Sequence, residues 1–321
     1  MIKQLIKSAV ATSRAWPAVA RIRGKKGVRV LMYHRITRYG ALFEGTDIDD
    51  FVEQMRWLKH HCTIIAPEEF TETLGRPDFR RPPVLVTFDD GYRDYYQNAF
   101  PVLEELKIPS LVFLATGFLD DGGLIWTDAI VWAVRRSPRR RVSLPWNNRA
   151  EFNLSKEGDQ KRCYGQAKEY LKNLRDADRR IWQARLFERL DVDPARTDVG
   201  RQMLTWDEVR ATMGLTRYGG HTHTHPILSQ LEPRQAEEEI TRCRSRIREE
   251  TGRTPRYFAY PNGRAQDFTE DTKVILRRYG FELAFATIEG THAPGMDLYA
   301  IRRQPTGSRS IGDFAWLVAG S

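Results

Sequence analysis

Strand-like and helix-like segments alternate along most of this chain. Short apolar runs that favour strands occur at residues 28–34, 83–88, 110–116, 257–261, 281–287 and 299–305. Helical patterns lie among them, at residues 47–61, 98–107, 205–212, 233–251 and 269–280. Elements that alternate in this order predict an α/β protein with a parallel sheet, which is either open or closed into a barrel.

The chain is expected to form one elaborated domain. Its 321 residues, 41% of them hydrophobic, can bury a sizeable core, and we assign residues 27–305 to the α/β unit. Residues 118–202 interrupt the alternation as a polar, Arg-rich and partly helical insertion. This insertion holds Trp and Leu residues of its own, so it is not a linker. We predict an amphipathic helix over residues 1–26 and a C-terminal helix over residues 306–321.

The net charge of +9 and the pI near 9.5 favour anionic surroundings. Positive charge gathers before residue 27 and again at residues 135–141, where a solvated basic face is the simplest interpretation. Neither zinc-finger spacing nor an aromatic stacking platform accompanies these stretches. We therefore expect no nucleic-acid partner.

The first 20 residues resemble a signal peptide only in part. Lys7, Ser13 and Arg14 interrupt the apolar centre that such a peptide requires, so we expect the segment to stay uncleaved. As a basic amphipathic helix it would dock on its own domain or lie on a membrane surface, and no run is long enough to span a membrane. Three widely separated cysteines fit a reducing compartment. The expected location is cytoplasmic, with peripheral membrane contact as the alternative.

Two carboxylates follow the apolar run at residues 83–88. Asp89 and Asp90 stand where this strand is expected to end, and Gly91 permits a sharp turn. The carboxyl ends of parallel strands form the active face of such folds, and a turn there can bring both side chains to one pocket. One carboxylate would bind a metal and the other would take a proton. Ordinary turn chemistry is the alternative interpretation of Asp-Asp-Gly.

Three of the seven histidines fall within five positions, at His221, His223 and His225. The i, i+4 spacing of His221 and His225 would place both rings on one face of a helical turn, as in a two-histidine metal clamp. Two imidazoles and one carboxylate form a three-ligand site with open positions, which is the catalytic pattern. Zinc is the natural occupant, although this donor set suits other first-row metals. His223 is expected to point elsewhere, in a supporting or solvent-facing position.

Three motifs in this order resemble the polysaccharide deacetylase family, also called the NodB-homology carbohydrate esterases. They are TFDDG at 87–91, HTHTH at 221–225 and FAYPNG at 258–263. The resemblance covers about residues 28–120 and 203–305. It implies a distorted (β/α) barrel that removes acetyl groups from N-acetylated sugars with a divalent metal.

The resemblance also implies roles for individual residues. Asp89 would be the general base, and Asp90, His221 and His225 would be the metal ligands. The third motif would supply a backbone N–H near Asn262 as the oxyanion donor, with Pro261 shaping the turn. For the Asn262 side chain, a plain Pro-Asn-Gly turn is an equal alternative.

Two features depart from the commoner family pattern. The third motif usually holds an Arg that orients the base, and this chain has Ala259 there. Arg302 or Arg303 could replace it from a late strand, and we also count Arg303 among the substrate-binding residues. No histidine with the usual spacing follows late in the chain, and His292 lies in a Gly/Pro-rich loop where it is expected to be incidental.

A histidine at the other end of the chain resembles the catalytic acid of the circularly permuted branch of the family. The first strand ends in LMYHRI, so His34 would inherit that role. An imidazole suits proton donation to a leaving group because it changes charge near neutral pH. A capping or core histidine is the alternative.

Aromatic side chains near these motifs suggest a substrate groove. Tyr92, which follows the acidic motif, and Trp126, near Asp128, could pack on the apolar faces of sugar rings. Core packing is an equal interpretation for Trp126.

Together these features predict a metal-dependent hydrolase that removes N-acetyl groups from an amino sugar in a polysaccharide or its precursor. The expected cofactor is a divalent metal, most simply Zn²⁺, and the expected partner is an N-acetylated glycan. Two alternatives remain at this stage. One is a glycan-binding barrel with an inactive metal site, and the other is a deacylase of a lipid-linked amino sugar.

Overall fold

The computed structural model describes residues 16, 26–76 and 79–319. Within them, seven parallel strands close into a barrel, in the order β1, β12, β11, β10, β9, β6 and β5, and β5 pairs back to β1. The predicted (β/α) barrel is confirmed, and the sheet is closed rather than open. The strands are β1 (Arg29–Tyr33), β5 (Pro83–Phe88), β6 (Ser110–Leu114), β9 (Thr216–Gly220), β10 (Tyr257–Ala259), β11 (Leu283–Glu289) and β12 (Ile301–Pro305).

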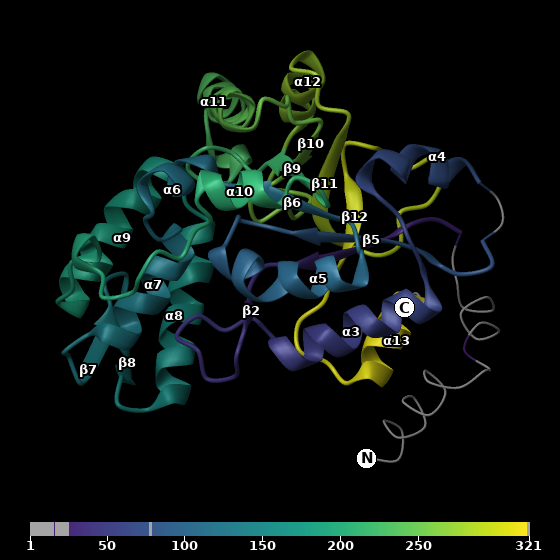
Figure 1. Ribbon diagram of the computed structural model, residues 1–321. Helices are drawn as coiled ribbons and strands as arrows, with labels where there is room; N and C mark the ends of the chain where they lie inside the picture. Colours follow the sequence, from purple (N-terminus) through teal and green to yellow (C-terminus); the bar gives the residue numbers. More distant parts are fainter. Residues whose placement is uncertain (1–15, 17–25, 77–78, 320–321) are drawn as a thin grey trace.

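Helices surround the barrel (Figure 1). Helix α10 (Trp206–Thr212) begins where the sequence predicts, because a capping box is present: the Thr205 hydroxyl accepts from the Glu208 amide at 3.2 Å, and the Glu208 carboxylate accepts from the Thr205 amide at 2.9 Å. The barrel helices are α3 (Ile48–His61), α4 (Phe70–Gly75), α5 (Phe100–Leu106), α10 (Trp206–Thr212), α11 (Pro233–Thr251), α12 (Glu270–Arg278) and α13 (Ile311–Ala319).

Strand β9 was not expected from the sequence, because it ends in Gly219 and Gly220. Packing explains the first glycine. A Cβ on Gly219 would lie 2.6 Å from the Tyr257 carbonyl oxygen and 2.7 Å from the Phe113 ring. Glycine therefore lets β9 approach β10 and the apolar barrel interior closely.

The insertion at 118–202 forms a lobe on one side of the barrel (Figure 1). Its helices share the core of the barrel through buried side chains such as Ile130, Leu171 and Leu186. It also holds an antiparallel hairpin that the prediction did not include. The elements of this region are α6 (Thr116–Asp121), α7 (Trp126–Arg136), β7 (Arg141–Leu144), β8 (Asn147–Asn153), α8 (Glu157–Lys172) and α9 (Asp176–Leu190).

The predictions for the two ends of the chain have different outcomes. The predicted N-terminal helix over residues 1–26 lies outside the described residues, except for Trp16 and Lys26. The expected C-terminal helix is α13, which packs on α3 through Phe314 and Trp57, with ring centroids 5.9 Å apart. Among the helices of the described residues, none has the length and apolarity needed to cross a membrane.

Candidate metal centre and active site

The two carboxylates lie directly after β5, at the carboxyl end of the barrel. The Asp89 amide donates to the Tyr33 carbonyl at 2.9 Å, which extends the pairing of β5 with β1 by one residue. The chain then turns sharply, because Asp90 (φ 74°) and Gly91 (φ 81°) are both left-handed. A left-handed aspartate is uncommon and costs conformational energy, so the turn is held by its surroundings. The side chains of Asp89 and Asp90 are both buried.

The histidines lie in a loop after β9, and the predicted helical turn is wrong. Thr222 (φ 65°) and His225 (φ 57°) are left-handed, and the Thr222 hydroxyl accepts from the His225 amide at 3.0 Å. This local bond curls the loop. It brings the His221 and His225 rings to a centroid separation of 4.9 Å.

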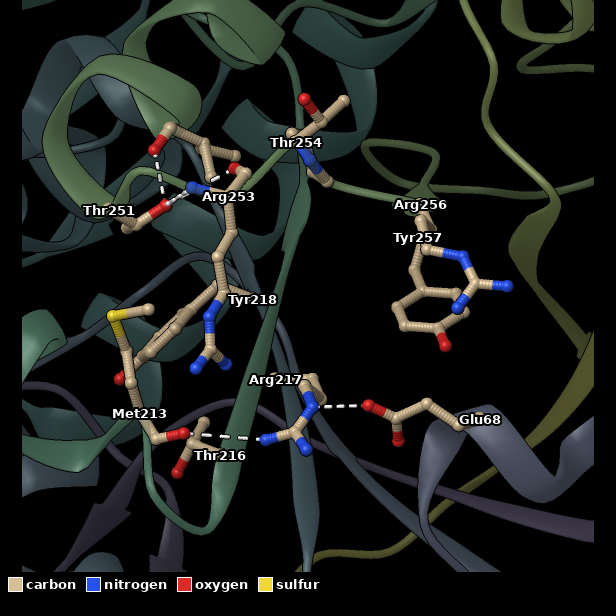
Figure 2. Close-up of a pocket in the computed structure, with 12 residues that line it drawn as sticks. Glu68, Met213, Thr216, Arg217, Tyr218, Thr251, Arg253, Thr254, Arg256 and Tyr257 are labelled. Atoms are coloured by element: carbon tan, nitrogen blue, oxygen red, sulfur yellow. Dashed lines mark hydrogen bonds and ion pairs between the residues drawn. The ribbon is translucent and has the colours of Figure 1, made fainter.

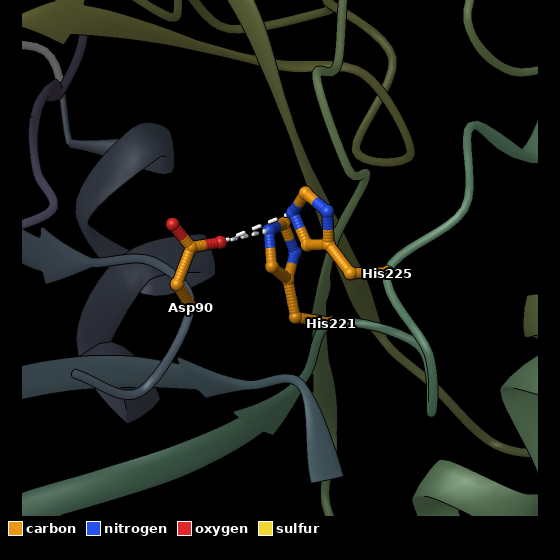
Figure 3. A group of neighbouring side chains, drawn as sticks. All are labelled: Asp90, His221 and His225. Atoms are coloured by element: carbon orange, nitrogen blue, oxygen red, sulfur yellow. Dashed lines mark ion pairs between the residues drawn. The ribbon is translucent and has the colours of Figure 1, made fainter. Parts of the chain in front are cut away.

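Asp90, His221 and His225 come together as a buried triad (Figure 3). The Asp90 Oδ1 atom lies 3.2 Å from His221 Nε2 and 3.1 Å from His225 Nε2. The possible ligand atoms all lie within 4.8 Å of one another. Residues more than 100 positions apart in sequence thus aim one oxygen and two nitrogens at a common point.

The hydrogen bond on the far side of His221 makes this triad suitable for a cation. The Nδ1 atom lies 2.7 Å from the Ala259 carbonyl oxygen, which can only accept, so Nδ1 carries the proton. In the neutral ring, Nε2 then presents a lone pair to the Asp90 carboxylate. Asp90 Oδ1 is buried without a hydrogen-bond partner among the described residues. Facing lone pairs are stabilised by a positive charge between them, and two imidazoles with one carboxylate are a usual donor set for zinc.

The electrostatics of the triad agree with this interpretation. Burial by itself raises the pKa of Asp90, but the His221 and His225 imidazoles outweigh it and hold that pKa well below its ordinary value. Burial lowers the pKa of His225. At His221 the Asp90 and Asp89 carboxylates outweigh burial, so its pKa is raised. The site therefore attracts a positive charge, which is a proton or a metal ion.

Glu239 of α11 holds the histidine loop, a contact that the sequence analysis missed. Its Oε2 atom accepts from the His223 amide at 2.8 Å and from the Thr224 amide at 2.7 Å, and its Oε1 atom accepts from the Thr224 hydroxyl at 2.7 Å. His223 points away from the triad, is buried, and lies 2.9 Å from the Thr116 hydroxyl through Nδ1. The only sequence signal for Glu239 is an acidic residue on a charged helix.

Arg303 of β12 forms a two-pronged ion pair with Asp89. Its Nη1 lies 2.6 Å from Oδ1 and its Nη2 lies 2.7 Å from Oδ2. Arg303 is fully buried, so its assignment as a substrate-binding residue is wrong, and it contacts the expected base instead. Burial raises the pKa of Asp89, but the Arg303 charge outweighs it and lowers that pKa below the ordinary value. Arg302 points elsewhere, toward the Glu289 carbonyl oxygen.

His34 lies at the rim of this site. It follows β1, its side chain is 47% exposed, and its Nε2 atom is 3.8 Å from Asp89 Oδ2. This distance is too long for a hydrogen bond, but it places an exposed imidazole on the solvent side of a buried carboxylate. The arrangement permits a bound molecule to exchange a proton with the His34 imidazole or with the Asp89 carboxylate.

The third motif forms a tight turn after β10. Asn262 is left-handed (φ 60°), its side chain donates to Asp267 Oδ2 at 2.5 Å, and its carbonyl accepts from the Thr287 hydroxyl at 2.8 Å. Pro261 is buried in this turn. The Asn262 side chain therefore holds the loop together, as expected of a Pro-Asn-Gly turn. The contact of His221 with Ala259 joins the start of this loop to the triad.

The two aromatic residues do not line a groove. Tyr92 is 4% exposed and lies beneath Arg35, while Trp126 is 6% exposed and packs under Arg179, whose Cζ is 4.9 Å from the ring. The predicted groove position is wrong for Tyr92. For Trp126 the structure favours the core-packing alternative.

A separate cavity of about 280 Å³ lies at the opposite end of the barrel (Figure 2). It opens beside Thr216 and Tyr257, the first residues of β9 and β10, whereas the triad follows the last residues of the strands. Two arginines at this cavity have surface partners, since Arg217 pairs with Glu68 and Arg256 pairs with Glu282. This cavity therefore lies apart from the triad, and these two arginines are held in pairs at the surface.

The sequence profile of the polysaccharide deacetylase family matches residues 76–182 and 197–284, more than half of the chain. The chain belongs to the polysaccharide deacetylase family. Both matched segments contain parts of the site, since the first includes Asp89 and Asp90 and the second includes the histidine loop.

Curated relatives and solved structures agree with the family. A poly-β-1,6-N-acetyl-D-glucosamine N-deacetylase of Staphylococcus aureus is 25% identical over 145 residues, which are 41% of this chain and 50% of that protein. The enzyme of the same name from Staphylococcus epidermidis is 30% identical over 111 residues, 30% of this chain and 38% of that protein. The chain thus spans half or less of the length of these relatives.

Two solved structures share the fold over most of their length. The deacetylase PplD of Streptococcus pyogenes has a TM-score of 0.62 at 17% identity, covering 91% of this chain and 98% of that one. IcaB from Ammonifex degensii has a TM-score of 0.59 at 23% identity, covering 92% and 98%. At these identities the similarity concerns the fold.

Proposed function

We propose that this member of the polysaccharide deacetylase family is a metal-dependent hydrolase that removes N-acetyl groups from an amino sugar in a polysaccharide or its precursor. One observation carries the proposal. The buried triad of Asp90, His221 and His225 lies next to a second buried carboxylate, Asp89, which Arg303 holds in its ionised form.

Each side chain has a chemical task in this reaction. An amide is a poor electrophile, and a divalent cation held by Asp90, His221 and His225 would polarise its carbonyl group and make water a stronger acid. Asp89 is adjacent to the triad and accepts the proton of the attacking water. His34, on the exposed side of Asp89, donates a proton to the departing amine.

Two further groups orient the reaction. Arg303 binds both oxygens of Asp89 and thereby fixes the direction of its lone pairs. The backbone N–H of Asn262, in the turn joined to the triad through Ala259 and His221, is the proposed donor to the developing oxyanion. For the metal we propose Zn²⁺, because histidine nitrogens and one carboxylate suit it.

The named activity of the staphylococcal relatives supports an N-acetylglucosamine polymer as the substrate class. The alternative of a glycan-binding barrel without turnover is favoured by Ala259, which stands where the family commonly has an Arg. The two-pronged contact of Arg303 with Asp89 weakens that alternative, since the base has an arginine partner from another strand. A lipid-linked substrate would be favoured by membrane contact of the basic segment before residue 27, nearly all of which lies outside the described residues.

Acetate release from a β-1,6-linked N-acetylglucosamine oligomer tests the proposal. We expect the zinc-loaded protein to release acetate and Asp89→Asn to lose at least about a thousandfold in rate while it still binds zinc. Arg302→Gln is the matched control, because Arg302 lies next to Arg303 and does not contact Asp89. Oligomer binding without acetate release by the wild-type protein would favour the glycan-binding alternative.

A further inference from the structure

A buried arginine follows His34 directly in the chain. Arg35 lies between β1 and β2 (Ile36–Thr37), and only 5% of its surface is exposed. Its guanidinium lies between two rings, with Cζ 3.5 Å from the centroid of Tyr92 and 4.6 Å from that of Phe43. A buried cation is costly unless anionic partners surround it, so this position requires carboxylates.

The partners of Arg35 come from three distant parts of the chain. Its Nη1 donates to Asp94 Oδ2 at 3.1 Å, and its Nη2 donates to Asp128 Oδ2 at 2.7 Å. Nη1 also donates to Gln202 Oε1 at 3.3 Å. Asp94 follows the Asp-Asp-Gly turn, whereas Asp128 and Gln202 stand near the start and the end of the insertion at 118–202. One guanidinium therefore joins the first strand, the acidic turn and both ends of the insertion.

The backbone around His34 is bound on both sides. Before it, the Tyr33 carbonyl accepts from the Asp89 amide at 2.9 Å. After it, the Arg35 carbonyl accepts from the Thr46 amide at 2.9 Å, and the Ile36 amide donates to Asp94 Oδ1 at 2.8 Å. Asp94 thus receives both the Arg35 side chain and the next backbone N–H.

The His34 ring itself is weakly held by comparison. Its side chain is half exposed, and its separation from Asp89 exceeds hydrogen-bond length. The place of the imidazole is therefore set by the backbone that carries it. That backbone is fixed by Arg35 and Asp94.

We propose that Arg35 is a positioning residue. By tying the segment after His34 to Asp94, Asp128 and Gln202, it holds the His34 imidazole beside Asp89 and makes the insertion a part of the catalytic unit. The proposal rests on the proposed function, in which His34 donates a proton to the departing amine. Displacement of such a group by about 1 Å can cost up to about a hundredfold in rate.

A double-mutant cycle tests this role. Arg35→Lys keeps the charge but cannot reach both carboxylates with a planar fork, so we expect kcat to fall about tenfold while KM changes less than about twofold. In a His34→Ala background, Arg35→Lys should lower kcat less than about twofold further, because no imidazole remains to be positioned. Equal losses in both backgrounds, or an unchanged kcat for Arg35→Lys, would overturn the proposal.

A second readout separates this inference from the hydrolase proposal. In zinc-loaded protein labelled with ¹⁵N at histidine, Arg35→Lys should shift the His34 ring signals and leave those of His221 and His225 in place. Arg93→Lys is the matched control, since Arg93 is a neighbour of Asp94 that pairs with Glu208. Failure of the wild-type protein to release acetate would remove the hydrolase function, whereas unmoved His34 signals in Arg35→Lys would remove the positioning role.

A milder variant covers the case in which Arg35→Lys does not fold. Asp128→Asn keeps the arginine and its contact with Asp94 but weakens the bond to the insertion. We expect it to shift the His34 signals in the same direction by a smaller amount. Signals identical to those of the wild-type protein would contradict the coupling of the insertion to His34.

Discussion

The two ends of the barrel differ in how they hold charge. At the amino end, a cavity of about 280 Å³ is bordered by Arg217 and Arg256, and each pairs with a glutamate at the surface. At the carboxyl end, Asp89 and Asp90 are buried, Asp90 and His225 are left-handed, and Asp90 Oδ1 is buried without a hydrogen-bond partner among the described residues.

This contrast shows that the amino-end cavity and the chemically reactive groups lie at different ends of the barrel. Exposed ion pairs contribute little free energy and leave no group in need of a ligand. A buried carboxylate that faces two imidazoles from a strained turn is costly, and such costs are typical of functional sites. The carboxyl end is also where parallel barrels place their active sites, while the amino end serves stability.

Removal of a triad ligand should give the largest difference in zinc affinity and acetate release between substitutions at the two ends. We expect Asp90→Ala, His221→Ala or His225→Ala to lower zinc affinity at least about a hundredfold and acetate release at least about a thousandfold, because each removes one of three ligands. Equilibrium dialysis and acetate assays measure both quantities. Arg217→Ala and Arg256→Ala, at the amino end, should change neither more than about twofold. Loss of acetate release in an amino-end variant would contradict the assignment of the reaction to the carboxyl end.

Adjacent arginines on β12 sharpen the comparison between buried and exposed charge. Arg303→Met removes the partner of a buried carboxylate, so we expect the free energy of unfolding to fall by about 3–5 kcal/mol. Arg302→Met should lower it by less than about 1 kcal/mol, because Arg302 is only partly buried and bonds to a carbonyl oxygen. Chemical denaturation of both variants measures the difference. Similar losses for both arginines would contradict the assignment of Arg303 as the anchor of Asp89.

His292 is expected to make stability depend on pH at the amino end. Its backbone pairs with Val28 just before β1, its Nε2 is buried without a partner among the described residues, and burial lowers its pKa to about 4. Between about pH 6.5 and 4, the unfolded chain binds a proton that the folded chain does not, so stability should fall as the pH falls. The full effect of such a shift is up to roughly 3 kcal/mol.

Unfolding curves across this pH window test the role of His292. His292→Gln cannot titrate, so its free energy of unfolding should depend less on pH between 6.5 and 4 than that of the wild-type protein. Parallel curves for the two proteins would show that another group causes the pH dependence.

The surface ion pairs at the amino end should give the smallest effects. Arg217→Ala and Arg256→Ala each remove a partly exposed pair, and we expect the free energy of unfolding to change by less than about 1 kcal/mol. Thermal unfolding at low and high salt measures this change, which should shrink as salt screens the pairs. A larger loss that resists salt would show that this end holds charge as tightly as the other.

The alternation of elements predicted a parallel sheet without deciding whether it is open or closed, and the closed barrel was implied only by the resemblance to the deacetylase family. Alternating segments are compatible with an open or a closed sheet, and closure depends on the pairing of β1 with β5, which are about 50 residues apart. Strand β9 escaped prediction because Gly219 has low strand propensity, and only its contacts with Phe113 and Tyr257 explain the glycine.

The residues of the site were easier to predict than their geometry. Residue type and position singled out His221 and His225 with one of two carboxylates, and the family resemblance implied Asp90, but the spacing suggested a helical turn where the structure has a loop. That loop depends on Glu239, a contact from another element. Likewise, the two arginines of β12 are equivalent in sequence, and only the barrel shows that Arg303 faces Asp89.

Anomalous diffraction at the zinc edge from zinc-loaded crystals tests the central claim most directly. We expect one strong peak within about 2.0–2.2 Å of an Asp90 carboxylate oxygen and of the Nε2 atoms of His221 and His225. A strong peak elsewhere, or none at the triad in zinc-loaded protein, would contradict the account.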